Sequence, residues 1–293
     1  MKRFVLFLGA VGLLTCLPAT VVADGSWFEN FDSYALGSGL HGQGGWKGWD
    51  NDPAFSAPVT QDEARSGSQS VAIAGESNLV HESCTWEDGL YSFSAWQYIP
   101  SDFASGGGRQ LDGTYFALLN TYNDGGPYHW STQLQFNSND GLLHAWHGDG
   151  DNTINVPYDT DRWVKIQTVV DLGNDWTQIY YDDDLVTEYT WTGGILGDGG
   201  GALDIAAVDL LANDSSFVYY DDISLLRCEL EDDFEPFGFD DDLHGLGGWK
   251  GWDDDPAFST PITQDQAHSG AQSLDVSGSA NLLHEFCTRH EDV

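Results

Sequence analysis

Alternating apolar and polar positions predict a succession of β-strands along most of the chain up to residue 226. The runs with a period of two, rich in aromatic and β-branched residues, are 91–98, 114–119, 131–136, 163–172, 176–181, 202–210 and 217–226. Such alternation is typical of a strand with one buried face. No stretch keeps the apolar period of 3.6 residues that indicates an amphipathic helix. We therefore expect an all-β protein built as a two-sheet antiparallel β-sandwich.

A long internal repeat divides the chain. Residues 40–84 match residues 243–287 at a constant offset of 203, with 30 identities in 45 aligned positions. A period of this length corresponds to a whole domain, because the units of solenoids and propellers have about 20 to 50 residues. We expect one complete domain over residues 24–228 and a truncated copy of its N-terminal part over residues 229–293.

The first 23 residues have the order of features found in a secretory signal peptide. Lys2 and Arg3 precede the apolar run 4–17, and small residues lead up to Asp24. The apolar run is too short for a permanent membrane helix. We expect an exported protein, extracellular or periplasmic, that does not insert into a membrane.

Composition and charge narrow the range of partners. The chain has 47 Asp and Glu residues against 10 Lys and Arg residues, a formal net charge of −37. Such a protein repels the phosphates of nucleic acid and anionic membrane surfaces, so we exclude both as partners. Hydrophobic residues make up 41% of the chain, which is enough to build a packed core despite the acidity.

Several strings resemble the concanavalin A-like, or laminin-G-like, jelly roll of exported bacterial proteins. They are 161–172, 179–182 and 218–225, together with the opening segments 31–34, 42–46 and 64–70. The resemblance implies a jelly-roll sandwich of this type. Members of the group include lectin-like binding modules as well as polysaccharide hydrolases and lyases, and the fold alone does not choose between them.

The sequence contains no recognisable catalytic motif. Glycoside hydrolysis uses two carboxyl groups at a defined separation, and similar hydrolases carry two Glu flanking an Asp at alternate strand positions. No such string occurs, and Glu188 is the only Glu between Glu87 and Glu229. The Arg-rich, Gln-x-His and Tyr-Lys strings of the lyases are missing as well. We therefore favour a non-catalytic module that binds a neutral polysaccharide, with a hydrolase or lyase and a structural adhesion repeat as the alternatives.

Aromatic residues beside short polar residues are the candidate sugar-binding groups, because flat rings stack on sugar rings while polar side chains bind hydroxyls. These candidates are Trp46, Trp49, Asp50, Asp52, Tyr128, Trp130, His144 and Trp146. For Trp46 and Trp49, packing into the end of the sandwich is the alternative. Trp96, Trp163 and Trp176 alternate within strands, and we expect them in the core.

Calcium is the candidate metal, since its ligands are oxygen atoms and secreted acidic proteins encounter it at high concentration. The similarity to sugar-binding jelly rolls implies a structural ion held by Asp32 and the pair Asp221 and Asp222, with Glu29 as a further ligand. Solvated carboxylates at the sheet edge are the alternative interpretation.

Cysteine usage predicts one disulfide. Without the signal peptide the chain keeps Cys84, Cys228 and Cys287, an odd number for an oxidising compartment. Cys287 is the counterpart of Cys84 in the repeat. We predict a bridge between Cys84 and Cys228, with pairing of Cys228 and Cys287 as the alternative.

Overall fold

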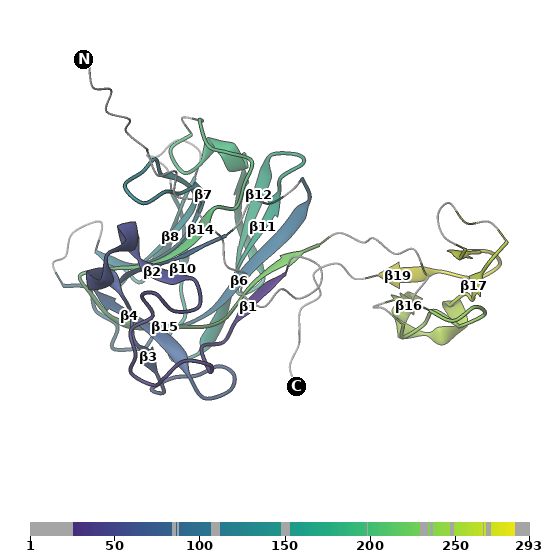
Figure 1. Ribbon diagram of the computed structural model, residues 1–293, viewed down its shortest axis with the longest axis horizontal. Helices are drawn as coiled ribbons and strands as arrows, with labels where there is room; N and C mark the ends of the chain where they lie inside the picture. The colour runs from purple at the N-terminus through teal and green to yellow at the C-terminus, as the bar shows by residue number, and fades with distance from the viewer. Residues whose placement is uncertain are drawn as a thin grey trace, which may run out of the picture.

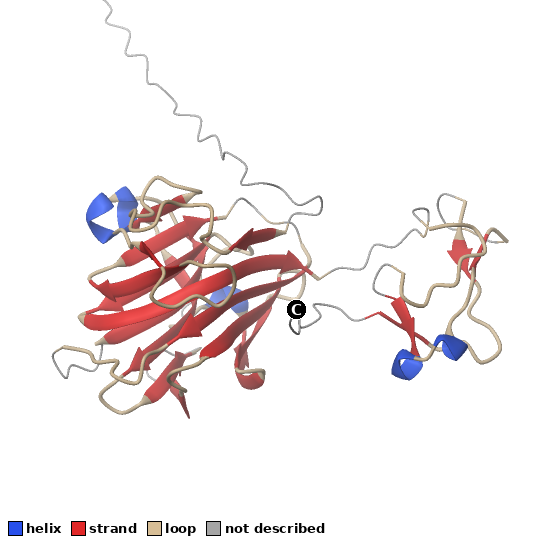
Figure 2. Ribbon diagram, turned by 90° about the horizontal axis from the view of Figure 1, so that it is seen from below, coloured by secondary structure: helices blue, strands red, loops and turns tan. Residues whose placement is uncertain are grey.

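Two antiparallel sheets form a sandwich in the computed structural model (Figure 1). The structure describes residues 26–83, 86, 88–106, 112–147, 153–197, 199–228, 234, 237–246, 249–265, 267 and 271–284. The predicted signal peptide lies outside these residues. The two-sheet, all-β prediction is confirmed, and the arrows of Figure 2 show the two layers of strands.

The larger sheet has eight strands. Its order is β13 (Asp184–Tyr189), β12 (Trp176–Tyr181), β11 (Trp163–Asp171), β6 (Leu90–Tyr98), β15 (Ser215–Arg227), β4 (Ser70–Gly75) and β3 (Val59–Thr60), with β1 (Trp27–Glu29) pairing beside β15. Neighbouring strands pair antiparallel throughout.

The second sheet has seven strands and carries the candidate site. Its order is β10 (Thr153–Pro157), β9 (Leu142–Trp146), β8 (His129–Asn137), β7 (Gly113–Thr121), β14 (Ala207–Asn213), β5 (Asn78–Glu82) and β2 (Trp46–Gly48). The strand predicted over 202–210 begins only at residue 207, because residues 202–206 form the connection that leads into β14.

Short 3₁₀ turns are the only helical segments among the described residues: η1 (Trp49–Asn51), η2 (Pro53–Phe55), η3 (Trp191–Gly193), η4 (Trp252–Asp254) and η5 (Pro256–Phe258). None has the length or the apolar composition that crossing a lipid bilayer requires.

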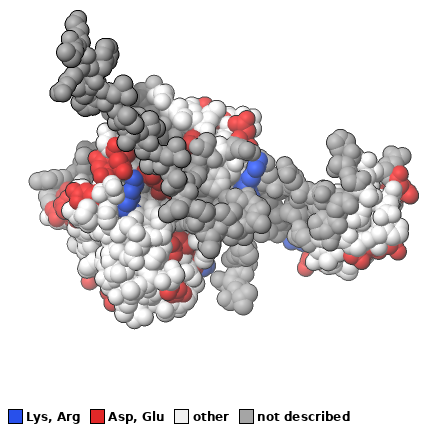
Figure 3. All heavy atoms as spheres, in the orientation of Figure 1, with Lys and Arg blue, Asp and Glu red and all other residues white. Residues whose placement is uncertain are grey.

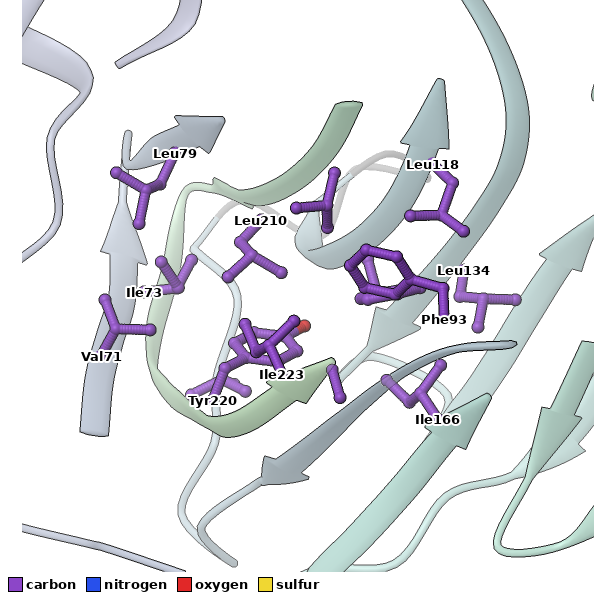
Figure 4. Close-up of a cluster of buried hydrophobic side chains, with 14 of the residues drawn as sticks. Val71, Ile73, Leu79, Phe93, Leu118, Leu134, Ile166, Leu210, Tyr220 and Ile223 are labelled. Atoms are coloured by element: carbon purple, nitrogen blue, oxygen red, sulfur yellow. The ribbon is translucent and has the colours of Figure 1, made fainter. Parts of the chain in front are cut away.

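The hydrophobic core fills the space between the two sheets. Figure 4 shows side chains from both sheets pointing toward one another, among them Phe93 and Ile166 from the larger sheet and Leu118 and Leu134 from the smaller. These four residues are at most 1% exposed. Burial of apolar area on this scale is the main source of stability for a sandwich of this kind.

Three tryptophans predicted in the core lie instead on the outer face of the larger sheet. Trp96 and Trp163 are half-buried, and Trp176 is 40% exposed. In β6, the small Ala95 points into the core while its bulkier neighbour Trp96 points out. Alternation had correctly indicated a strand, but it does not tell which of the two faces is buried.

Residues 237–284 contain four short strands that pair only with one another. β16 (Trp249–Gly251) pairs with β19 (Leu282–His284), and β17 (Ile262–Thr263) pairs with β18 (Ser273–Leu274). These strands lie apart from the sandwich in Figure 1. The domain boundaries and the truncated copy stay predictions.

Acidic side chains far outnumber basic ones in the sequence. On the face shown in Figure 3, red carboxylates are spread over several regions and blue basic groups are few. Several of the basic groups are paired with acids, as Lys47 is with Glu82 and Arg162 is with Asp182.

Candidate functional site

An aromatic cluster, by which we mean Trp49, Tyr122, Tyr128 and Trp130, lies on the seven-stranded sheet. The ring centroid of Trp49 is 5.0 Å from that of Tyr122, 4.7 Å from that of Tyr128 and 5.9 Å from that of Trp130. The rings of Trp49 and Trp130 are nearly parallel, at 6°. Tyr122 is buried, and the other three are half-buried. Partly exposed rings in contact provide a surface that can stack on sugar rings.

The aromatic cluster is on the outer face of the sheet. Val80 and Leu119 are buried and pack against the cluster, whereas their chain neighbours Leu79 and Leu118 belong to the core between the sheets. Because successive strand residues point to opposite faces, Val80 and Leu119 point away from that core. They form an apolar floor that supports the rings from below.

A tight loop brings Trp49 and Asp50 over the end of β2. Asp50 has a φ of 53°, a left-handed conformation that Asp tolerates better than most residues. A Cβ on Gly48 would lie 2.0 Å from the carbonyl oxygen of Asp52, so the loop requires glycine there. The exposed Asp52 accepts a 2.9 Å hydrogen bond from the amide of Ala54 and caps η2. This hydrogen bond of Asp52 therefore lies within its own loop.

Asp50 connects this loop to the turn between β7 and β8. Its Oδ1 accepts hydrogen bonds from the Tyr128 hydroxyl and from the Gly125 amide, the latter at 2.9 Å. The bond from Tyr128, followed by that from Gly125, lowers the pKa of Asp50, and the same contact raises the pKa of Tyr128. At neutral pH the site thus presents an ionised carboxylate beside a protonated phenol.

Lys47 lies beneath the aromatic cluster and joins three elements. Its Nζ is 2.5 Å from Glu82 Oε1, 2.6 Å from Asp124 Oδ1 and 5.1 Å from the ring centroid of Tyr122. Burial lowers the pKa of Lys47, but the bonds to Asp124 and Glu82 outweigh it and raise the pKa. The ammonium group stays charged and holds β2, β5 and the β7–β8 turn together.

His144 and Trp146 share the outer face of the sheet but belong to β9. Both alternate with the buried core residues Leu143 and Ala145. The Nε2 of His144 is 2.9 Å from Asp140 Oδ2. Trp146 is half-buried, and its Nε1 is enclosed without a hydrogen-bond partner among the described residues. The structure thus places Trp49, Asp50, Tyr128 and Trp130 together and sets His144 and Trp146 on the same face.

Trp46 is a core residue. It is 1% exposed, and its ring contacts those of Trp27, Phe31 and His81. Its Nε1 lies 3.4 Å from Glu29 Oε2. Trp46 therefore packs in the sandwich, which was the alternative expectation for this residue. The expectation that it contacts a sugar is wrong, because its ring is enclosed between the sheets.

Two of the predicted calcium ligands anchor the loop that precedes β4. Asp221 Oδ2 accepts hydrogen bonds from the amides of Arg65 at 2.8 Å and Ser66 at 3.1 Å. Asp222 pairs with Arg65 Nη1 at 2.6 Å, and the Arg65 guanidinium lies 3.6 Å from the Trp96 ring centroid. Burial, followed by the charge of Asp222, raises the pKa of Asp221 to about 7. A guanidinium group balances this acidic pair.

The other two predicted ligands are also engaged with protein groups. Glu29 accepts hydrogen bonds from the Phe31 amide at 2.8 Å and the Tyr34 hydroxyl at 2.5 Å, and Asp32 accepts one from the Ser68 amide at 2.9 Å. Within the described residues, no three acidic, His or Cys side chains converge as metal ligands do. The calcium site stays a prediction, and melting with calcium and with a chelator is its test.

The predicted Cys84–Cys228 bridge stays a prediction, because Cys84 lies outside the described residues. Cys228 is buried, and its amide donates a 2.7 Å hydrogen bond to the carbonyl oxygen of Leu90 at the start of β6. Ser83, the residue before Cys84, donates to the carbonyl oxygen of Ala206.

Sequence reasoning missed three residues beside the predicted ones. Tyr122 belongs to the aromatic cluster, and Asp124 pairs with Lys47 beneath it. Both residues precede Tyr128 in a polar turn, and this position in the sequence could have identified them. The third is Asp209, in the middle of the outer face. It is 2% exposed, and burial raises its pKa to about 8. A single Asp within an otherwise apolar strand, Ala207–Ala212, was its signal.

No family model matches the chain, and no curated protein matches it. Solved structures that are similar include a sialidase, with a TM-score of 0.46, 10% identity and coverage of 70% of this chain. This chain spans 19% of the length of that sialidase.

Two further similar structures are from bacteria. Domain 4 of AbnA, an extracellular arabinanase from Geobacillus stearothermophilus in complex with arabinotriose, has a TM-score of 0.41 and 16% identity, covering 68% of this chain and 90% of that one. A carbohydrate-binding module from Bacillus subtilis has a TM-score of 0.38 and 13% identity, covering 61% and 94%. All three similar structures have TM-scores below 0.5 and identities of at most 16%.

Proposed function

We propose that residues 24–228 form an exported, non-catalytic module that binds a neutral polysaccharide on the outer face of the seven-stranded sheet. The observation that carries the proposal is the contact between the half-exposed rings of Trp49, Tyr128 and Trp130, with the Asp50 carboxylate beside them. Rings stack on the apolar face of a sugar while carboxylates accept hydrogen bonds from its hydroxyls.

The charge of the protein supports a neutral ligand. A formal net charge of −37 repels acidic polysaccharides at long range. If further copies of the domain follow one another in a longer protein, weak sites would combine through avidity.

Cleavage of the glycan is the second candidate, and Asp209 is the observation that favours it. A carboxyl group with a raised pKa is suited to general acid catalysis. Glycoside hydrolysis also needs a second carboxyl group about 5 to 10 Å away. Burial alone raises the pKa of Asp209, and among the described residues no neighbouring charge contributes. Release of reducing ends from any glycan would favour cleavage over binding.

Affinity electrophoresis in gels that contain β-glucan, xylan, arabinan or mannan tests the proposal. We expect retardation of the unaltered chain in at least one gel and about tenfold weaker retention of Trp130→Ala, since the stacking surface is lost. Unretarded migration in every gel would overturn the proposal.

Two matched tryptophan variants serve as controls. Trp176→Ala removes a 40% exposed ring from the outer face of the other sheet. Trp252→Ala removes the repeat counterpart of Trp49, which is 53% exposed. Both should bind like the unaltered chain, and weakening by either variant equal to that of Trp130→Ala would contradict the placement of the site.

A further inference from the structure

The described residues of 234–284 repeat the local structure of residues 31–81, at the constant offset of 203. We call these two ranges the second segment and the first segment. The registers of β17 with β18 and of β16 with β19 equal those of β3 with β4 and of β2 with β5, residue for residue. The ring centroids of Phe234 and Trp249 lie 6.0 Å apart, and those of their counterparts lie 5.8 Å apart. The second segment thus already makes contacts that the first makes within itself.

The two segments differ in the strands beside them. In the first segment, β4 also pairs with β15 and β5 also pairs with β14. Among the described strands, β18 and β19 have no such second neighbour. β18 has two residues where β4 has six, and β19 has three where β5 has five. We attribute the shorter strands to these open edges, since a strand is stabilised by its neighbours in the sheet.

Apolar side chains of the second segment are uncovered beside these open edges. Val276 is 60% exposed, whereas its counterpart Ile73 is 0% exposed in the core. Leu282 is half-buried, whereas its counterpart Leu79 is 0% exposed. Open edges with uncovered aliphatic side chains favour the addition of further strands, because both backbone hydrogen bonds and apolar burial are gained.

We propose that the second segment can replace the first beside β14 and β15 of its own chain, so that β18 pairs with β15 and β19 pairs with β14. The two segments then compete for one partner, residues 207–227. The structure shows the arrangement in which the first segment occupies this position. The inference goes beyond the proposed function and does not depend on it.

The connection between β15 and the second segment is long enough for this exchange. β1 pairs with β15 up to Ile223, and Phe31 lies two residues beyond that pair. The way back from Arg227 to the level of Phe31 is about six residues along the strand, or about 20 Å. The seven residues from Arg227 to Phe234, the counterpart of Phe31, extend to about 24 Å.

One difference in sequence favours the first segment. Ala72 in β4 is 3% exposed and lies opposite Tyr219. Its counterpart in the second segment is Asp275, which is exposed. Exchange would move this carboxylate to the buried position and remove its solvation, which disfavours the exchanged arrangement.

Hydrogen exchange and thermal melting of the full chain test the inference, under reducing conditions so that no disulfide holds either segment. Ile73→Asp places a carboxylate in the core of the first segment. The matched control, Leu210→Asp, does so in β14, which both segments need, and both replaced residues are 0% exposed. We expect Ile73→Asp to keep a cooperative melting transition, to slow exchange of the amides of 273–283 about a hundredfold and to lose protection of 70–80. Leu210→Asp should show neither the transition nor the slowed exchange.

Two substitutions in the second segment sharpen the test. Val276→Asp alone should leave the melting temperature unchanged, because the side chain it replaces is exposed. Combined with Ile73→Asp it should abolish the transition, since both segments are then damaged. Asp275→Ala combined with Ile73→Asp should raise the melting temperature by about 5 °C, because exchange no longer buries that carboxylate.

Three outcomes would overturn the inference. The first is that Ile73→Asp unfolds like Leu210→Asp both with and without Asp275→Ala. The second is a folded Ile73→Asp variant in which residues 70–80 stay protected. The third is exchange that occurs only in a dimer on size-exclusion chromatography, because the partner is then β14 and β15 of another copy. None of these outcomes bears on the proposed function, since no glycan is present.

Discussion

Replacing Asp209 by Asn should abolish a specific pH dependence of stability. The carboxyl group of Asp209 is 2% exposed, and burial raises its pKa from 3.8 to about 8 in the folded protein. In the unfolded chain the group is solvated and has an ordinary pKa of about 3.9. Asn has nearly the same shape and fills the same space, but it does not titrate.

The sign and the size of the effect follow from proton linkage. Between about pH 4 and pH 8 the folded protein holds a proton on Asp209 that the unfolded chain has released, so stability falls as the pH rises through this window. Each pH unit within the window corresponds to about 1.4 kcal/mol. From pH 5 to pH 8, the stability of the unaltered chain should therefore fall by about 4 kcal/mol through Asp209, a loss that Asn does not cause.

Urea unfolding at pH 5 and pH 8, followed by tryptophan fluorescence, measures this difference. The quantity of interest is the gap in unfolding free energy between Asp209→Asn and the unaltered chain, because other titrating groups, Asp221 among them, contribute equally to both. We expect the gap to widen by about 4 kcal/mol in favour of Asn at pH 8. An identical gap at the two pH values would show that Asp209 ionises normally, and it would refute its burial.

Two other predictions concern parts of the structure away from the candidate site. Arg65→Ala should lower the free energy of unfolding by about 2 kcal/mol, because the variant leaves Asp222 without its cation and removes the group stacked on Trp96. Thermal melting measures this loss of stability. An equal loss in Arg65→Lys would point to the stacking on Trp96 rather than to the charge. Peptide mapping without reduction should recover Cys84 joined to Cys228, and a free thiol at Cys84 would contradict that pairing.

The fold could be predicted because alternation survives wherever one face of a strand is buried. Ranges such as 91–98 and 176–181 correspond closely to β6 and β12. The shorter β9 and β13 were not predicted, since five or six residues with few aromatic side chains leave little periodicity to detect. Which face is buried depends on the neighbouring strands, as Ala95 and Trp96 show, and that information is not local.

The candidate site was only partly predictable for the same reason. Trp49 and Tyr128 stood out because each is an aromatic residue in a polar loop, a local feature of the sequence. Their contact, at 4.7 Å, joins residues 79 positions apart and depends on how β5, β14 and β7 order themselves between the two loops. Trp46 has a similar local sequence to Trp49, but it lies in β2 and faces the core, whereas Trp49 lies in the turn η1 that follows the strand.

The two matching segments of the chain separate local from long-range causes. Asp50 and Asp253 both have left-handed conformations, with φ of 53° and 58°, so the same short sequence forms the same turn in both places. The ring carried by that turn nevertheless differs: Trp49 is half-buried against Tyr128, whereas Trp252 is 53% exposed. The turn is thus a property of a few consecutive residues, while the aromatic cluster exists only where the β7–β8 turn meets it. A binding surface assembled in this way requires both turns of the sandwich. The described part of residues 237–284 has the turn that carries Trp252 but no counterpart of the β7–β8 turn.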